Sequence, residues 1–101
     1  MGPRNELSHI FENILGNTNV YFEPPENVKL KYPCIIYNKS IIEKDYAGNK
    51  PYLMKQRYMG TLIYLDPDSD LPTKMALIPY CRNTNHFIVD NLYHDTYEIY
   101  Y

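Results

Sequence analysis

The sequence predicts a single α+β domain over residues 1–101, with a four-stranded, mainly antiparallel sheet and two helices in the order α-β-β-α-β-β. The length of 101 residues suits one hydrophobic core and is too short for two. Hydrophobic residues make up 45% and charged residues 22%, which is typical of a chain that folds. Two segments have helical apolar spacing and four resemble strands, and this order favours helices on one face of an antiparallel sheet.

The first predicted element is a helix over residues 3–15. Its apolar residues repeat at the i, i+3, i+4, i+7 spacing of one helix face, and they are Leu7, Ile10, Phe11 and Ile14. Pro3 suits the first helical turn, and Gly16-Asn17 provides a stop signal. The apolar face must therefore be covered by a sheet or by a partner.

A loop and a long hairpin follow the helix. We expect a loop over residues 17–31, because Pro24-Pro25 removes two consecutive backbone donors. Strand-forming residues over 32–42 predict the first strand. Turn residues over 45–51 then lead into a second strand-like stretch over 52–65, which together indicate a hairpin.

The last third of the chain predicts a short helix and a second hairpin. Apolar residues at helical spacing place the helix near residues 69–81, and Pro79 should end or kink it. Residues 86–89 and 92–101 have strand composition, and Asp90-Asn91 supplies the turn between them.

Tyrosine is the most unusual feature of the composition, with 12 residues against three phenylalanines and no tryptophan. Tyrosine combines a large apolar ring with a polar tip, so it suits both strands and surfaces that a partner covers. In the last strand, strict alternation places Tyr93, Tyr97, Ile99 and Tyr101 on one side, and His94, Thr96, Glu98 and Tyr100 on the other. Two short helices cannot cover every tyrosine, which favours contacts with other subunits.

The charge of the chain argues against two classes of partner. A net charge of −2 provides no broad positive field for nucleic acid or for an anionic membrane. No apolar run approaches the roughly 20 residues of a membrane span, and no signal-peptide pattern opens the chain, so we expect a protein of the cytoplasm. The best alternative surface for a nucleic acid interleaves charges and aromatics, at Lys50, Tyr52, Lys55, Arg57 and Tyr58.

No motif for metal or nucleotide chemistry is complete. Asp66, Asp68 and Asp70 resemble the start of a calcium loop, but the sixth and twelfth positions are Leu71 and Leu77 instead of glycine and an acid. The acids are better explained as helix caps. The cysteines and histidines lack a closely spaced ligand pair, and the four glycines are scattered. We therefore expect no metal and no cofactor.

Cys34 and Cys81 are expected to be free, buried thiols, because a chain without a secretory signal rarely forms disulfides. A Cys-His nucleophilic pair stays open at this level, since such partners meet only in space. Neither cysteine stands in a recognisable nucleophile motif, however, and the sequence predicts a protein that is not an enzyme.

Four segments carry a resemblance to a known family. They are residues 20–25 (VYFEPP), 32–37 (YPCIIY), 49–52 (NKPY) and 61–72 (TLIYLDPDSDLP). With the order of elements, they resemble the small tail-terminator or tail-completion proteins of long-tailed bacteriophages, also described as minor tail, minor capsid or head-tail joining proteins. The resemblance extends over most of the chain.

The resemblance implies a structural subunit of the virion, made in the cytoplasm of a bacterial host. Subunits of this family form a ring, commonly a hexamer, on the head-proximal end of the tail tube. The ring ends tube growth and contacts the head connector or a neck protein, so the implied partners are other copies, the tail-tube protein and the connector.

A ring subunit must bury two different patches against identical neighbours. Tyrosine-rich strands supply contact area at low conformational cost. The candidate interface residues are Tyr46, Asn49 and Lys50 on the hairpin and Tyr93, Tyr97 and Tyr101 on the last strand. Two alternatives remain open: another neck or head-closure subunit, and a small monomeric or dimeric regulatory module that binds a protein.

Overall fold

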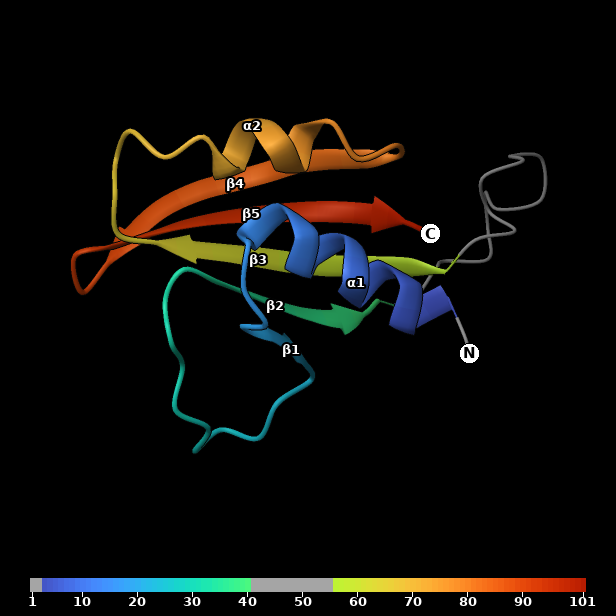
Figure 1. Cartoon of the computed structure of the whole chain (residues 1–101), viewed down its shortest axis with the longest axis horizontal. Helices are drawn as coiled ribbons and strands as arrows, with labels where there is room; N and C mark the ends of the chain where they lie inside the picture. Colours follow the sequence, from blue (N-terminus) through green and yellow to red (C-terminus); the bar gives the residue numbers. More distant parts are fainter. Residues whose placement is uncertain (1–2, 41–55) are drawn as a thin grey trace.

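The computed structural model describes residues 3–40 and 56–101, and it has two layers. A five-stranded sheet in the order β1-β2-β3-β5-β4 forms one layer, and two helices on one face of it form the other (Figure 1). The elements are α1 (Pro3–Leu15), β1 (Val20–Phe22), β2 (Cys34–Lys39), β3 (Arg57–Tyr64), α2 (Leu71–Ala76), β4 (Cys81–Val89) and β5 (Leu92–Tyr100). Neither helix in the described ranges has the length and apolar character needed to cross a membrane.

The prediction of a four-stranded, mainly antiparallel sheet in the order α-β-β-α-β-β is wrong, because the segment after α1 contributes a fifth strand. β1 pairs with β2 in parallel, so the sheet is mixed and the order is α-β-β-β-α-β-β. The two prolines that predicted a loop over 17–31 come only after Phe22, and they therefore leave the three strand residues free to pair. Residues 23–33 then carry the chain back to begin β2 in the same direction.

Side-chain amides hold this parallel crossover in place. Asn19 donates from Nδ2 to the carbonyl oxygen of Pro33 at 3.2 Å, and Asn17 donates to the same oxygen at 3.3 Å. At the far end of β1, the backbone N–H of Glu23 donates to the carbonyl oxygen of Tyr37 at 2.9 Å. The first sheet edge is therefore short and bonded at both of its ends.

Helix α1 matches the predicted range of residues 3–15, which confirms that prediction. Its apolar face covers the sheet, where Leu7 and Phe11 are fully buried. The ring of Phe11 meets the ring of Tyr37 edge to face, with 5.1 Å between the centroids. Burying side chains of this size stabilises the fold by roughly 2–3 kcal/mol each.

Helix α2 is shorter than the predicted 69–81. It ends at Ala76, and Tyr80 takes a left-handed backbone conformation with φ 57° before β4 begins at Cys81. The capping prediction is also corrected, because Asp70 at the N-cap makes no side-chain hydrogen bond. Ser69 Oγ accepts from the N–H of Leu71 instead, at 3.2 Å.

The core takes in more tyrosine than the composition suggested. Four of the described tyrosines are buried between the sheet and the helices: Tyr37, Tyr58, Tyr64 and Tyr97. Tyr37 Oη donates to the carbonyl oxygen of Arg4 at 3.1 Å and also bonds Ser8 Oγ, so its polar tip is satisfied beneath α1. These buried rings leave fewer tyrosines for a partner.

Candidate functional site

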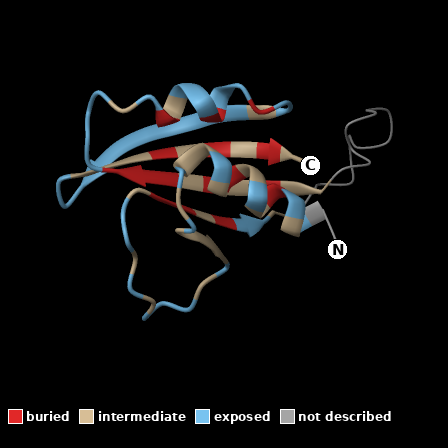
Figure 2. Cartoon of the chain, in the orientation of Figure 1, coloured by how far each residue is buried: buried red, intermediate tan, exposed pale blue. Residues whose placement is uncertain are grey.

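Strand β4 is the most exposed regular element of the fold. It forms an edge of the sheet, and in the described part of the chain it pairs with β5 alone. Every residue from Arg82 to Val89 is exposed, and Figure 2 shows this strand in pale blue, whereas β3 and β5 contain only buried and intermediate residues. A nine-residue edge strand with open backbone groups can pair with another chain.

The C-terminal end of β4 is apolar. Phe87, Ile88 and Val89 are 38%, 59% and 47% exposed, and they stand next to one another in the chain. They account for three of the seven large hydrophobic side chains that are exposed among the described residues. A cluster of this kind on a sheet edge marks a protein contact more strongly than scattered apolar residues do.

A tight turn presents this apolar end at the tip of the β4–β5 hairpin. Asp90 and Asn91 have φ values of 54° and 63°. Positive φ at both central residues is the pattern of a type I′ turn, whose twist matches that of the two strands. The turn predicted at Asp90-Asn91 is therefore confirmed. The strand before it is longer than the predicted 86–89, since it begins at Cys81.

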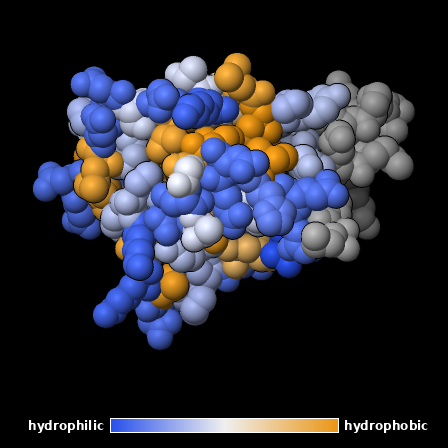
Figure 3. All heavy atoms as spheres, in the orientation of Figure 1, coloured by the Kyte–Doolittle hydropathy of each residue, from blue (hydrophilic) through white to orange (hydrophobic). Residues whose placement is uncertain are grey.

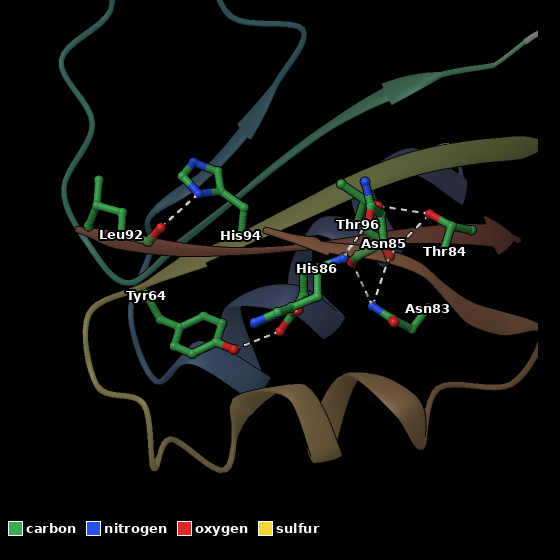
Figure 4. A network of polar contacts seen from close by, with 9 residues as sticks. Tyr64, Asn83, Thr84, Asn85, His86, Leu92, His94 and Thr96 are labelled. Carbon is green, nitrogen blue, oxygen red and sulfur yellow. Dashed lines mark hydrogen bonds and ion pairs between the residues drawn. The ribbon is translucent and has the colours of Figure 1, made fainter. Parts of the chain in front are cut away.

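A polar network beneath β4 fixes this strand to the sheet. Asp95 on β5 is 5% exposed. Tyr64 on β3 donates from Oη to Asp95 Oδ2 at 2.8 Å, and His86 Nδ1 on β4 bonds the other carboxylate oxygen (Figure 4). Burial, followed by the hydrogen bond to Asp95, raises the pKa of Tyr64 to about 12. The network thus joins three adjacent strands.

The network also bears on catalysis. A buried carboxylate against a histidine forms the orienting half of a hydrolase triad. Here, however, Tyr64 bonds the carboxylate, and its raised pKa keeps it protonated at neutral pH. Aromatic stacking holds the same residues, because Tyr93 lies 5.4 Å from Tyr64 and 6.1 Å from His86 between ring centroids. The arrangement therefore supports β4.

A bulge interrupts β4 halfway along its length. The register with β5 shifts between Asn83 and Asn85, which leaves Thr84 as the extra residue. Thr84 Oγ1 lies 2.8 Å from Thr96 Oγ1, and Asn83 Nδ2 donates to the Thr96 carbonyl oxygen at 3.1 Å (Figure 4). The bulge separates a polar first half of the strand from the apolar end.

A second candidate surface lies on the helix face. A groove of about 500 Å³ runs between α1 and the segment that follows α2. Its lining includes Ile10, Ile14, Leu77, Ile78, Pro79 and Tyr101. Figure 3 shows hydrophobic atoms gathered between the two helices. Within the described lining Lys74 carries the one charge, and Leu77 is 77% exposed.

The predicted interface residues lie in different environments in the structure. Tyr97 is 1% exposed and packs in the core, because its side of β5 faces the helices. The structure therefore moves Tyr97 from the candidate surface to the core. Tyr93 is half-buried in the aromatic stack, and Tyr101 lines the groove and donates to Glu6 Oε1 at 3.1 Å. Tyr46, Asn49 and Lys50 lie outside the described residues.

The two cysteines lie on different strands, and Cys81 is the first residue of β4. Both cysteines are free thiols, and burial raises the pKa of Cys34 and that of Cys81 to about 11 each. Both thiols are therefore protonated at neutral pH and poor nucleophiles. Among residues 3–40 and 56–101, no three metal-binding side chains form a group.

The described part of the alternative nucleic-acid surface is not an open platform. Tyr58 is 2% exposed on the helix face, and Arg57 lies 3.5 Å from Glu98 in an ion pair. Lys50, Tyr52 and Lys55 lie outside the described residues. A stacking surface needs exposed rings, which Tyr58 does not provide.

Sequence reasoning missed the exposed edge of β4, although a signal for it was present. The turn at Asp90-Asn91 pairs Val89 with Leu92, so a long second strand requires an equally long first strand. Extending the predicted strand backward from Val89 by the length of β5 would have reached Cys81. The composition gave no sign of the early start of this strand, because residues 82–85 are polar and resemble a loop.

Comparison of the chain with protein-family models, with curated protein sequences and with solved structures found no match.

Proposed function

We propose that this chain is a structural subunit of a phage tail, whose copies form a ring at the head-proximal end of the tail tube. The ring ends growth of the tube and joins the tail to the head. The partners are other copies in a hexamer, the tail-tube protein, and a head connector or neck protein. The protein acts in the neck of the virion, after synthesis in the cytoplasm of the bacterial host, and has no catalytic step.

The observation that supports this proposal is the exposed edge of β4. Proteins that act alone protect long edge strands with charges, prolines or covering segments. β4 carries a bulge near Thr84, but its end at Phe87, Ile88 and Val89 is apolar and exposed. An assembly subunit explains the exposed apolar end, because a neighbour covers it.

The order of residues along β4 favours a ring over a two-fold dimer. If two copies of β4 paired antiparallel about their centres, Ile88 would stand opposite Arg82, and Phe87 opposite Asn83. Apolar side chains would then meet polar or charged ones, which is a poor match. A contact between two different surfaces avoids this mismatch, and repeated contacts of that kind form a ring when the rotation between neighbours returns to its start.

Deletion of the gene in its phage, followed by complementation, tests the proposal. We expect the deletion to produce overlong tails without heads in electron micrographs. The wild-type gene restores infectious particles, whereas Ile88→Lys does not, because a charge at the apolar end opposes contact with a neighbour. The matched control is Asn27→Lys, which adds the same charge at an exposed loop position.

The other outcomes separate the alternatives. Tails of normal length without heads would point to a neck or head-closure subunit and would contradict termination. Particles of normal form after deletion would contradict the whole assembly role and would favour a regulatory module. Full complementation by Ile88→Lys would show that the apolar end of β4 is not needed for contact with a neighbour.

A further inference from the structure

Resting on the proposed ring function, we infer that the tip of the β4–β5 hairpin of one copy docks in the groove between α1 and α2 of the next copy. The hairpin tip is defined here as Ile88, Val89 and Asp90. The helix groove is the apolar groove between the helices that Leu77 and Lys74 help to line. This names the two different patches that a head-to-tail contact requires.

The two patches match in their apolar chemistry. Ile88 and Val89 are among the most exposed aliphatic side chains of the described chain, at 59% and 47%. The groove presents Leu77 at 77% exposure beside the half-buried Ile10 and Ile14. Its volume of about 500 Å³ lies within the range of pockets that hold a specific ligand. Docking would remove both apolar surfaces from water at once.

The two patches also match in charge. Asp90 is exposed in the turn directly after Val89. Lys74 stands in the lining of the groove, and its partner within the chain is Asp70 at 3.6 Å. Both members of that pair are largely exposed, so the pair contributes little to stability and leaves the ammonium group accessible. Asp90 of a neighbour therefore competes with Asp70 for the ammonium group of Lys74.

The positions of the patches require two copies. Strand β5 runs from Leu92, next to the tip, to Tyr100, which lines the groove. Eight residue steps of a strand span roughly 26 Å. Figure 1 shows the hairpin turn at one end of the sheet and the last residues of β5 at the other. A chain therefore cannot fill its own groove, and each copy has one tip and one groove to offer.

Mixing two defective variants of the full chain tests this contact. Ile88→Lys damages the tip and leaves the groove intact, whereas Leu77→Lys damages the groove and leaves the tip intact. Both positions are exposed, so the fold should survive, and circular dichroism checks this. We expect each variant alone to remain monomeric in sedimentation velocity, with self-association weakened about tenfold or more relative to the wild type.

The equimolar mixture distinguishes this contact from one in which two tips, or two grooves, meet each other. The intact tip of Leu77→Lys docks in the intact groove of Ile88→Lys, and this produces a heterodimer in native mass spectrometry. Growth stops there, because the remaining tip and groove both carry lysine. Asn27→Lys serves as the control and associates like the wild type.

Three results would overturn the inference: a Leu77→Lys chain that associates like the wild type, a mixture that remains monomeric, or a wild type that is monomeric at every concentration. None of these results depends on the phage experiment. Overlong tails after gene deletion, together with a monomeric wild type, would retain the ring function and reject this contact.

Discussion

At the scale of single residues, Asp95 links the core to the candidate interface. Its carboxylate is buried, and it accepts from a tyrosine on β3 while bonding a histidine on β4. A buried carboxylate without partners would destabilise the fold, so its two partners hold the three strands in one register. The edge that we propose as an interface thus rests on a fixed support.

The hydroxyl of Tyr64 should therefore contribute measurably to stability. We expect Tyr64→Phe to lower the free energy of unfolding by about 1–2 kcal/mol, because it removes one hydrogen bond and leaves a buried carboxylate oxygen unpaired. Urea denaturation measures this change. The control is Tyr93→Phe, since Tyr93 contacts Tyr64 and His86 through its ring, and we expect a change below about 0.5 kcal/mol. Equal losses in the two variants would contradict the assigned bond.

The raised pKa of Tyr64 predicts that the protein loses stability at alkaline pH. The pKa of Tyr64 is raised from its ordinary value of 10 to about 12 in the fold, mainly by burial. Its contribution is therefore complete below pH 10 and is lost as the pH rises from 10 to 12, where the unfolded chain releases the proton more readily. Tyr97 is shifted in the same direction, also by burial.

Urea midpoints measured up to pH 12 check this prediction, and tyrosinate absorbance follows the ionisation. Tyr64→Phe should lose less stability than the wild type across the window from pH 10 to 12, because it has one fewer buried group to titrate. Identical slopes in the two proteins would show that Tyr64 ionises in the fold as easily as in the unfolded chain.

At the scale of elements, the β4–β5 hairpin depends on two residues in a left-handed conformation. Asp and Asn tolerate this conformation better than most residues, but glycine adopts it without steric cost. The turn therefore explains why a polar pair separates two long strands. It also makes the tip a defined structure rather than a free loop.

Substitution of Asn91 tests this account of the hairpin. We expect Asn91→Gly to raise the free energy of unfolding by about 0.5 kcal/mol, because it relieves the positive φ of 63°. Asn91→Val should lower the free energy of unfolding by about 1–3 kcal/mol, since a β-branched residue is strained there. Thermal denaturation followed by circular dichroism compares the two variants. A neutral Asn91→Val would contradict the assigned turn.

At the scale of the whole molecule, one core joins the helix layer to the sheet. Leu7 and Phe11 of α1, Met75 of α2, and Tyr37 and Tyr97 of the sheet all belong to the same buried cluster. Cys81 at the start of β4 packs against this cluster, and the rest of that strand is exposed. A small domain with a single core should therefore unfold in one step, and its exposed edge should contribute little to that step.

Substitution of two phenylalanines compares the contribution of the core to stability with that of the exposed edge. Phe11→Ala should lower the free energy of unfolding by about 3–5 kcal/mol, because a fully buried ring leaves a cavity between α1 and the sheet. Phe87→Ala removes a ring that is 38% exposed and stacks on His94, and it should cost about 1 kcal/mol or less. Guanidinium denaturation of both variants provides the comparison. Equal costs would place β4 inside the core.

The sequence was most informative where a local pattern decides the structure. Helix α1 begins and ends as predicted, because its apolar spacing and its stop signal lie within the segment itself. The turn at Asp90-Asn91 follows for the same reason. The end of α2 was partly visible, because Pro79 disfavours a helical conformation at Ile78, but no local rule placed the end at Ala76 or the start of a strand at Cys81.

From the sequence alone came the helix over residues 3–15, a second helix before Pro79 and the hairpin that turns at Asp90-Asn91, all of which the described residues contain. Only the tertiary structure decided that β1 pairs in parallel, that Tyr97 is buried, and that β4 is left exposed at the edge. The physical reason is that spacing and turn residues act within one segment. Strand neighbours and exposure depend instead on which distant segments meet, and a strand pattern looks the same at the centre of a sheet and at its edge.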